Sequence, residues 1–310
     1  MVWWILACSG GQPSETVASE QPNTEARQTI RLALNWYPEP EFGGFYEGVL
    51  GGHYEAAGFD VTIIPGGPGA PTLELLASGQ AEAAISAADD LLVKRSKGIE
   101  AVGVFPSLQI NPQGVMVHSS SGLTTLEGIT DGRVAIEIGS PFQSFLWKKY
   151  ALEGKVEPIP YGGSVGPFLI DETFRQQAYI TSEPCLAEGQ GASVSFLKAA
   201  DAGWNPYAAL LALADPPPPW AADFVAATEL AWQAYLDAPD RANAEMTRLN
   251  EQLKPDLIAC ITDAQRPFVT GEDGLGAMTE ARWEAVNASL IDLGLLPAGA
   301  LADGAWRVFP

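Results

Sequence analysis

The sequence alternates between short apolar runs and longer amphipathic stretches from residue 29 to residue 213. The runs have the length of buried strands, and the stretches between them have helical periodicity. The predicted strands are 30–34, 59–64, 83–85, 101–105, 115–117, 134–138, 156–160, 178–181, 194–197 and 207–213. Because strands that alternate with helices form parallel sheets with right-handed crossovers, the pattern predicts an α/β fold.

The remainder of the chain follows four consecutive prolines at 216–219, which form a stiff spacer. The sequence of this remainder predicts helices at 220–236, 241–253, 256–266 and 279–293. Trp232, Tyr235 and Trp283 have helical spacing in these segments, so we expect them in the core. We therefore expect two lobes of mainly parallel sheet flanked by helices, with a hinge between them and the helical segment packed on lobe one. Lobe one comprises 29–115 plus 211–310 and lobe two comprises 116–210.

The charge of the chain limits its partners. The formal net charge is −21 at pH 7, and the sequence pI is ≈ 4.3. Nucleic acids and anionic membranes require basic surfaces, so neither is an expected partner. No apolar run approaches the roughly 20 residues that cross a bilayer, so no transmembrane helix is predicted.

The first residues resemble the end of a bacterial lipoprotein signal. Residues 2–7 are apolar and precede Cys8, and residues 9–28 are polar and rich in Ser, Gln, Thr, Glu and Pro. A basic region and most of the apolar region of a signal peptide are missing. We expect residues 1–28 to be a truncated lipoprotein signal and tether, with Cys8 as the lipidated residue. The alternative is a ragged cytosolic N-terminus.

Cysteine and histidine give little support for catalysis. Cys185 and Cys260 are the other cysteines, so no disulfide framework is indicated, and no spacing suits zinc. Cys185 follows a proline at a predicted helix start, where its thiol pKa would be lowered, but no histidine is near in sequence. His53 and His118 fit structural roles better than that of a general base. We expect no metal, no cofactor and no enzymatic activity.

The segment 34–46 follows the first predicted strand and contains an aromatic pair, Trp36 and Tyr37. Ligands of open α/β sheets bind at the carboxyl ends of the strands, which is where this pair is expected. Trp36 is either a core aromatic or a stacking face for a ligand. Two carboxylates and two glycines follow within eight residues. These neighbouring residues favour a place for Trp36 in the wall of a pocket over a place in the core.

The glycine-rich segment 65–69 lies between a predicted strand and a helix. It lacks the GxGxxG spacing and the GK[ST] ending of specific phosphate loops. A close approach of the backbone to a flat ligand is therefore favoured over a phosphate cradle.

The chain resembles the type II periplasmic solute-binding proteins of ABC importers, in the group named for thiamine-pyrimidine biosynthesis and its relatives for riboflavin, taurine and nitrate. The resembling stretches are LNWYPEPEFGGFYEG (34–48), GFDVTIIPGGPGAP (58–71), SAADDLL (86–92), PYGGSVGPFLIDETFRQQAYITSEPCLAEGQG (160–191) and GWNPYAALL (203–211). The resemblance implies a lipid-anchored monomer on the periplasmic or extracellular face that delivers a small molecule to an ABC permease. It also implies that Trp36 stacks on a flat ring and that Glu183 accepts its amino groups.

Three other functions remain open. The eukaryotic pyrimidine synthases of this fold carry a cysteine-rich motif that this chain lacks, which argues against the first alternative, a pyrimidine-biosynthesis enzyme. The second alternative is a taurine- or nitrate-type anion binder. The third is an interaction or sensor domain that uses the same closure.

We expect the ligand contacts at the edges of both sheets and at helix starts. The expected residues are Trp36, Tyr37, Glu39, Phe42, Gly67, Ser86, Asp89, Asn111, Ser140, Phe142, Tyr161, Gly162, Gly163, Ser164 and Glu183. The loops that carry them contain no Lys or Arg, but contain several carboxylates. This lining predicts a neutral or cationic planar heterocycle with amino or N–H donors, of the thiamine-type aminopyrimidine or flavin-like kind. Carboxylates that point to solvent would weaken that prediction.

Overall fold

The computed structural model describes residues 1–3 and 26–309 and contains two five-stranded sheets. The first sheet consists, in spatial order, of β2 (Phe59–Ile64), β1 (Gln28–Ala33), β3 (Ala83–Ser86), β10 (Ala208–Ala214) and β4 (Ala101–Leu108). The second consists of β7 (Glu157–Pro160), β6 (Arg133–Ile136), β8 (Gln176–Tyr179), β5 (Gln113–His118) and β9 (Val194–Lys198). The predicted two-sheet α/β fold is confirmed.

Each sheet is mixed, with one reversed strand. In the first sheet β1 is parallel to β2 and β3, whereas β10 is antiparallel to β3 and β4. In the second sheet β6 is parallel to β7 and β8, whereas β5 is antiparallel to β8 and β9. The reversed strands are those by which the chain enters each sheet from the other one. They begin at the edge where the other strands end, so their direction must be opposite, which the alternation of strands and helices does not reveal.

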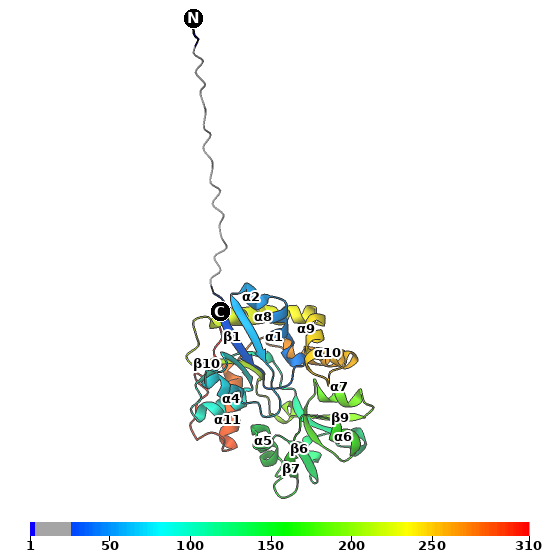
Figure 1. Ribbon diagram of the computed structural model, residues 1–310. Coiled ribbons are helices and arrows are strands. Elements are labelled where there is room, and N and C mark those ends of the chain that lie inside the picture. The colour runs from blue at the N-terminus through cyan, green and yellow to red at the C-terminus, as the bar shows by residue number, and fades with distance from the viewer. Residues whose placement is uncertain (4–25, 310) are drawn as a thin grey trace.

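Helices cover both sheets (Figure 1). The helices along the sheets are α1 (Gly43–Leu50), α2 (His53–Ala56), α3 (Thr72–Ala77), α4 (Ala88–Ser96), α5 (Pro141–Lys149), α6 (Gly166–Ile170) and α7 (Glu183–Glu188). The C-terminal helices are α8 (Ala221–Asp237), α9 (Asp240–Leu249), α10 (Pro255–Thr270) and α11 (Glu280–Asp292). The short 3₁₀ turns are η1 (Pro40–Phe42), η2 (Ser119–Ser121), η3 (Leu126–Gly128) and η4 (Ala200–Ala202). None of the helices in the described residues has the length and apolarity to cross a membrane.

The C-terminal helices pack mainly on the helices of the first sheet. α8 and α9 contact α1, α11 contacts α4, and α10 contacts both η1 and α7. We call the first sheet with α1 to α4 and these C-terminal helices the first lobe, and the second sheet with α5 to α7 the second lobe. Of the C-terminal helices, α10 therefore also touches the second lobe.

The glycine pair 43–44 serves the core and not the pocket wall that we expected. A Cβ on Gly43 would lie 2.1 Å from the ring of Tyr235, and one on Gly44 would lie 2.2 Å from the ring of Trp232. Trp232, Tyr235 and Trp283 are fully buried, as predicted. The glycines are therefore what allows α1 to approach the aromatic face of α8.

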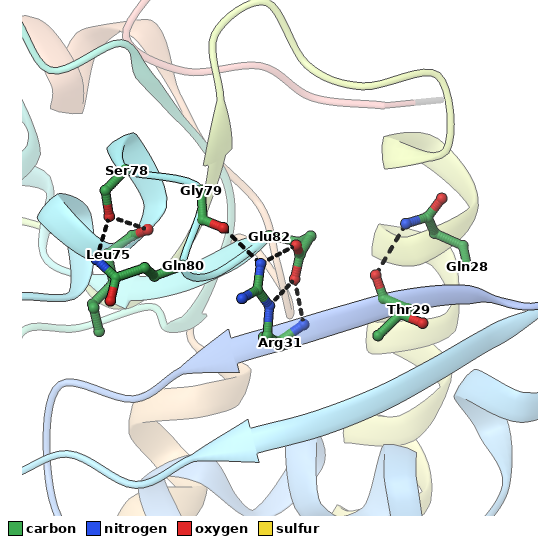
Figure 2. A network of polar contacts seen from close by, with 8 residues as sticks. All are labelled: Gln28, Thr29, Arg31, Leu75, Ser78, Gly79, Gln80 and Glu82. Atoms are coloured by element: carbon green, nitrogen blue, oxygen red, sulfur yellow. Dashed lines mark hydrogen bonds and ion pairs between the residues drawn. The ribbon is translucent and has the colours of Figure 1, made fainter.

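Arg31 joins β1 to the turn that precedes β3 (Figure 2). The Nε and backbone N–H groups of Arg31 donate to Oε2 of Glu82 at 3.0 and 2.8 Å. Its Nη2 donates to Oε1 of Glu82 and to the carbonyl of Gly79, both at 2.6 Å. β1 and β3 share only two paired positions. The arginine therefore reinforces the pairing that sets the end of β1.

Two segments, 109–112 and 205–207, connect the sheets. Asn205 Oδ1 accepts from the backbone N–H of Asn111 at 2.9 Å, and Asn111 Nδ2 donates to the carbonyl of Pro206 at 3.1 Å. The guanidinium of Arg282 lies 3.8 Å from the centre of the Tyr207 ring. The two connections thus run side by side, and we propose them as the hinge that divides the lobes.

A disulfide joins Cys185 in α7 to Cys260 in α10, with the Cα atoms 6.1 Å apart. The sequence indicated no disulfide framework and left open whether the two cysteines are free, and the structure pairs them, so Cys185 carries no free thiol whose pKa could be lowered. The two cysteines are 75 residues apart, and each stands alone in its segment. Their pairing depends on the contact between α7 and α10, which lie next to each other in Figure 1.

Candidate functional site

A cavity of about 550 Å³ lies between the two sheets. Its walls come from the segments that follow β1 and β3 in the first lobe and β6, β7 and β8 in the second. These are the carboxyl ends of the strands, where ligands of α/β sheets bind.

Most of the expected contact residues meet at this cavity. Those that line it are Trp36, Glu39, Ser86, Asp89, Asn111, Ser140, Phe142, Tyr161 and Glu183. Tyr37, Gly163 and Ser164 instead line a small adjoining hollow, which also touches Trp36, Glu39, Tyr161 and Glu183. Phe42, Gly67 and Gly162 line neither space, and Cys8 lies outside the described residues.

The three residues that do not line the cavity have other surroundings. Phe42 is fully buried in the core of the first lobe. A Cβ on Gly67 would lie 3.1 Å from the ring of Tyr37, so this glycine packs against that ring. A Cβ on Gly162 would meet no atom within 4 Å.

Trp36 and Tyr161 face each other from opposite lobes. Trp36 follows β1 and Tyr161 follows β7, and their rings are parallel within 5° with centroids 6.0 Å apart. Tyr37 packs edge-on against Trp36 at 5.4 Å. The backbone N–H of Gly66 donates to the carbonyl of Trp36 at 3.0 Å, so the glycine-rich segment braces this strand end. The arrangement brings flat aromatic faces from both lobes to the cavity.

Glu183 and Glu39 bind polar groups of the second lobe. The hydroxyl of Tyr161 donates to Oε1 of Glu183 at 2.6 Å, and the backbone N–H of Tyr179 donates to Oε2 at 2.8 Å. The hydroxyl of Ser182, which lines the adjoining hollow, donates to Oε2 of Glu39 at 2.7 Å. Glu183 therefore orients Tyr161, and Glu39 links the first lobe to α7.

Other expected contacts are engaged in supporting the walls. The Oγ of Ser140 accepts from the backbone N–H of Gln143 at 3.2 Å and caps α5, as the sequence predicts. Ser86 donates to Oδ2 of Asp90 at 3.2 Å. The amide of Asn111 joins the two connecting segments. Their side chains hold the cavity in shape.

Burial raises the pKa of the carboxyl groups in the cavity. It raises the pKa of Glu39 to about 8, with a further increase from the charge of Glu183. It raises the pKa of Asp89 to about 7, with a further increase from Asp90. The pKa of Glu183 and that of Glu41, which also feels Glu39, are raised by burial as well. The site therefore exchanges protons near neutral pH and favours a ligand that compensates negative charge.

Several lining residues were missed from the sequence. Asn35, Glu137 and Tyr179 line the cavity, the first just after β1, the second just after β6 and the third as the last residue of β8. Glu137 and Tyr179 fell inside strands that were predicted too long, and counting strand ends more strictly would have found them. Lys94 of α4 and Lys97, which directly follows α4, also line the cavity. They were missed because only the loops were searched for basic residues. Lys94 is paired with Glu74.

Neither histidine lines the cavity. The ring of His118 stacks on Phe168 with centroids 3.8 Å apart, and its Nε2 makes a 2.8 Å hydrogen bond to the carbonyl of Phe168. His53 lies 3.9 Å from Glu47. Both histidines therefore contact other protein groups and not the cavity.

Two sheets joined by paired connections, with a cavity between them, define the class of proteins with the periplasmic-binding-protein fold. The alkanesulfonate-binding protein SsuA of Xanthomonas axonopodis pv. citri, solved with MOPS bound, superposes with a TM-score of 0.66 at 14% identity, over 92% of this chain and 100% of that one. The aliphatic sulphonate binding protein SsuA of Escherichia coli superposes with a TM-score of 0.65 at 17% identity, over 87% of this chain and 89% of that one.

The particular family is given by the sequence match. Residues 39–242 match the model of the NMT1/THI5-like family, and the chain belongs to this family. The formylaminopyrimidine-binding protein of Halalkalibacterium halodurans is 27% identical over 214 residues, which are 64% of this chain and 63% of that protein. The match thus spans less than two thirds of the relative's length.

Proposed function

We propose that this protein is an extracytoplasmic solute-binding protein of an ABC importer that captures a planar heterocycle with amino groups, of the formylaminopyrimidine type. The family, the fold and the formylaminopyrimidine-binding relative support this function. The protein would deliver its ligand to a permease as a monomer. A lipid on Cys8 would anchor it to the membrane.

The observation that carries the proposal is the combination of facing aromatic rings and buried carboxyl groups. Trp36 and Tyr161 offer parallel faces from opposite lobes, and Glu39 and Glu183 lie beside them. Aromatic faces bind flat rings by stacking, and carboxylates accept hydrogen bonds from amino groups. A ligand that contacts both lobes would also hold them closed.

The charge of the lining disfavours an anionic ligand. Seven carboxyl groups line the cavity, against Lys94 and Lys97. The charge of Lys94 is offset by its pairing with Glu74. The pKa values of Glu39 and Asp89 are raised to about 8 and about 7, so a sulfonate or nitrate would have to keep these groups protonated and would be repelled by any that ionise. The likeness to the sulfonate-binding proteins is therefore one of fold.

Transport is favoured over catalysis by the chemistry of the lining. No histidine or cysteine lines the cavity in the part of the chain that the structure describes. The side chains present provide stacking faces and hydrogen-bond acceptors, which bind a ligand without activating a nucleophile. The Cys185–Cys260 disulfide supports an oxidising location outside the cytoplasm.

A thermal-shift panel tests the proposal. The purified protein is heated with formylaminopyrimidine, thiamine, riboflavin, taurine, an alkanesulfonate or nitrate. A ligand that binds only the folded state raises the unfolding midpoint. We expect a rise with formylaminopyrimidine and none with the anions, and recovery of the compound unchanged by mass spectrometry. A rise with taurine, sulfonate or nitrate alone would show that the proposed ligand class is wrong, and conversion of the compound would indicate an enzyme.

Gly163 provides a test of closure. It has a φ of 70°, and a Cβ there would lie 2.8 Å from Cγ of Pro68 and 3.3 Å from the ring of Trp36. Both neighbours belong to the first lobe, so Gly163→Ala should hold the lobes apart. We expect calorimetric affinity for formylaminopyrimidine to fall about tenfold, a loss of about 1.4 kcal/mol.

The matched control is Gly154→Ala. Gly154 also has a φ of 70°, but a Cβ there would meet no atom within 4 Å. It therefore reproduces the cost of a left-handed alanine, about 1–2 kcal/mol of stability, without a contact between the lobes. Equal affinities of the Gly163→Ala and Gly154→Ala variants would show that closure does not depend on this contact.

A further inference from the structure

The Cys185–Cys260 disulfide joins two helices that are built into different lobes. In α10, Ile258 and Ile261 are buried in the core of the first lobe. In α7, Ala187 is buried in the core of the second lobe. The bond therefore crosslinks the lobes, in addition to the two segments of chain that connect them.

The contacts around the disulfide hold both ends of α7 against the first lobe. Cys185 itself packs in the core of the first lobe, although its helix belongs to the second. A Cβ on Gly189, which directly follows α7, would lie 2.3 Å from Cδ2 of Leu257 in α10. Ser182, which directly precedes α7, donates to Glu39 of the first lobe. The crosslink thus lies in the middle of a continuous contact between the lobes.

The disulfide lies at a distance from the proposed hinge. The backbone N–H groups of Gln109 and Ile110, in one of the connecting segments, donate to the carbonyl of Phe268 at 2.6 and 3.3 Å. Cys260 precedes Phe268 by eight residues in α10, a distance of about 12 Å along a helix. A rotation of the second lobe about an axis at the connections displaces α7 by an amount that grows with this distance.

The geometry of a disulfide leaves little room for such a displacement. The Cα atoms of Cys185 and Cys260 are 6.1 Å apart. Disulfides seldom extend beyond a Cα separation of about 6.8 Å, which leaves about 0.7 Å. At about 12 Å from the axis, this slack permits a rotation of only about 3°. A wider opening needs an axis that passes close to the disulfide, or a broken bond.

We propose that the Cys185–Cys260 disulfide is a latch that limits the opening of the cavity and so slows the exchange of ligand. Glu183 begins α7 two residues before Cys185, so the latch also holds this lining residue against the first lobe. The inference rests on the proposed function in one respect, since it takes the ligand to bind between the lobes. It goes further by assigning the rate of capture and release to a bond outside the cavity.

A dithiol can open the latch from the side of Cys260. Cys260 is an exposed residue, whereas Cys185 is buried. A thiolate of the dithiol attacks Sγ of Cys260, the disulfide bond breaks, and the sulfur of Cys185 leaves as a thiolate that takes up a proton. The second thiolate of the dithiol then displaces Cys260, which takes up a proton in turn. The protein disulfide gains two electrons and the dithiol becomes its own disulfide, so the latch is sensitive to redox conditions.

Stopped-flow kinetics with formylaminopyrimidine test the latch. Oxidised wild-type protein is compared with wild type reduced by dithiothreitol and with the double variant Cys185→Ala and Cys260→Ala. Tryptophan fluorescence, to which Trp36 at the cavity contributes, reports binding. We expect the dissociation rate to rise at least about tenfold on loss of the bond, or about 1.4 kcal/mol in the barrier. Entry also requires opening, so the association rate should rise and Kd should change less than the dissociation rate.

Small-angle scattering of the ligand-free protein gives a readout that needs no ligand. Reduced wild type and the double variant should both have a larger radius of gyration than the oxidised protein, because their lobes can separate. All samples are measured well below their unfolding midpoints, and circular dichroism checks that they are folded.

Phe224→Ala is the control for a loss of stability alone. Phe224 is fully buried, packs on Tyr54 and Phe59, and lines neither the cavity nor the adjoining hollow. Truncation of a buried aromatic residue should lower the unfolding midpoint about as much as loss of the disulfide. The dissociation rate of this variant should stay within about threefold of that of the oxidised wild type, a small step on the scale that equates tenfold with 1.4 kcal/mol. An equal acceleration in Phe224→Ala would assign the effect to lower stability and overturn the latch.

The outcomes separate the latch from the proposed function. Equal dissociation rates of the oxidised and reduced proteins, with ligand bound by both, would overturn the latch and leave the proposed function in place. Faster dissociation at an unchanged association rate would also overturn it, because that result indicates an altered binding site. If no form binds formylaminopyrimidine, the proposed function is wrong and scattering alone decides. A larger radius after reduction then supports the latch, and equal radii overturn it.

Discussion

Removal of the disulfide by the double substitution Cys185→Ala and Cys260→Ala is expected to lower the free energy of unfolding by about 4 kcal/mol. The bond closes a loop between residues 75 apart, and a crosslink of that span restricts the unfolded chain strongly. It also fastens α7, which begins at Glu183, to α10 of the first lobe. The loss should appear as a fall of about 5–10 °C in the unfolding midpoint.

Reduction of the wild-type protein is the matched experiment. Dithiothreitol should shift the unfolding midpoint of the wild-type protein to nearly that of the double variant and should not shift the variant further. Mass spectrometry without reductant should find Cys185 and Cys260 joined in one peptide pair. Free thiols at both positions, together with equal midpoints for wild type and variant, would contradict the prediction.

Trp36→Ala is expected to weaken binding of formylaminopyrimidine about a hundredfold, or by about 3 kcal/mol. The substitution removes the stacking face contributed by the first lobe and leaves Tyr161 without its parallel partner. A stacked pair contributes roughly 0.5–1.5 kcal/mol beyond the apolar area that it buries, and an indole buries a large area. Calorimetric titration measures the change.

The control is Trp36→Phe, which keeps a flat ring at the end of β1. The phenylalanine variant should lose no more than about a tenth of the binding free energy that the alanine variant loses, which is well under 1 kcal/mol. Trp36 is half-buried and packs on the edge of the core, so unfolding is followed in parallel to show that both variants are folded. Affinity of the alanine variant within about threefold of wild type, a change under 1 kcal/mol, would place the ligand elsewhere.

The sequence was most informative where a local rule acts. The sequence predicts a short helix over residues 72–77 and an N-cap at Ser140, and α3 and α5 have these features. Both predictions succeed because capping and periodicity depend on neighbouring residues. The sequence predicts one helix over residues 42–57, but the structure divides this segment at Gly51 and Gly52, where Gly52 has a φ of 74°. A glycine inside a helical pattern is tolerated or not according to the packing on either side, which the local sequence does not contain.

The candidate site was predicted in part for the same reason. Strand ends can be found from apolar runs, and parallel strands bring their ends to one edge, and the structure brings Trp36, Asp89 and Glu183 together at one cavity. The packing role of the glycines could not be inferred from the local sequence. Those at 43–44 fit the Trp232 and Tyr235 rings, about 190 residues later in the chain, and not the ligand.

The sequence by itself determined the alternation of strands and helices, the two-lobed fold, the acidic lining and the aromatic residue at the end of β1, since each follows from local periodicity or composition. Only the tertiary structure decided the reversal of β5 and β10, the pairing of Cys185 with Cys260 and the approach of Tyr161 to Trp36. These features join residues far apart in the chain. Such contacts are selected by the packing of the whole fold, and no short stretch of sequence specifies them.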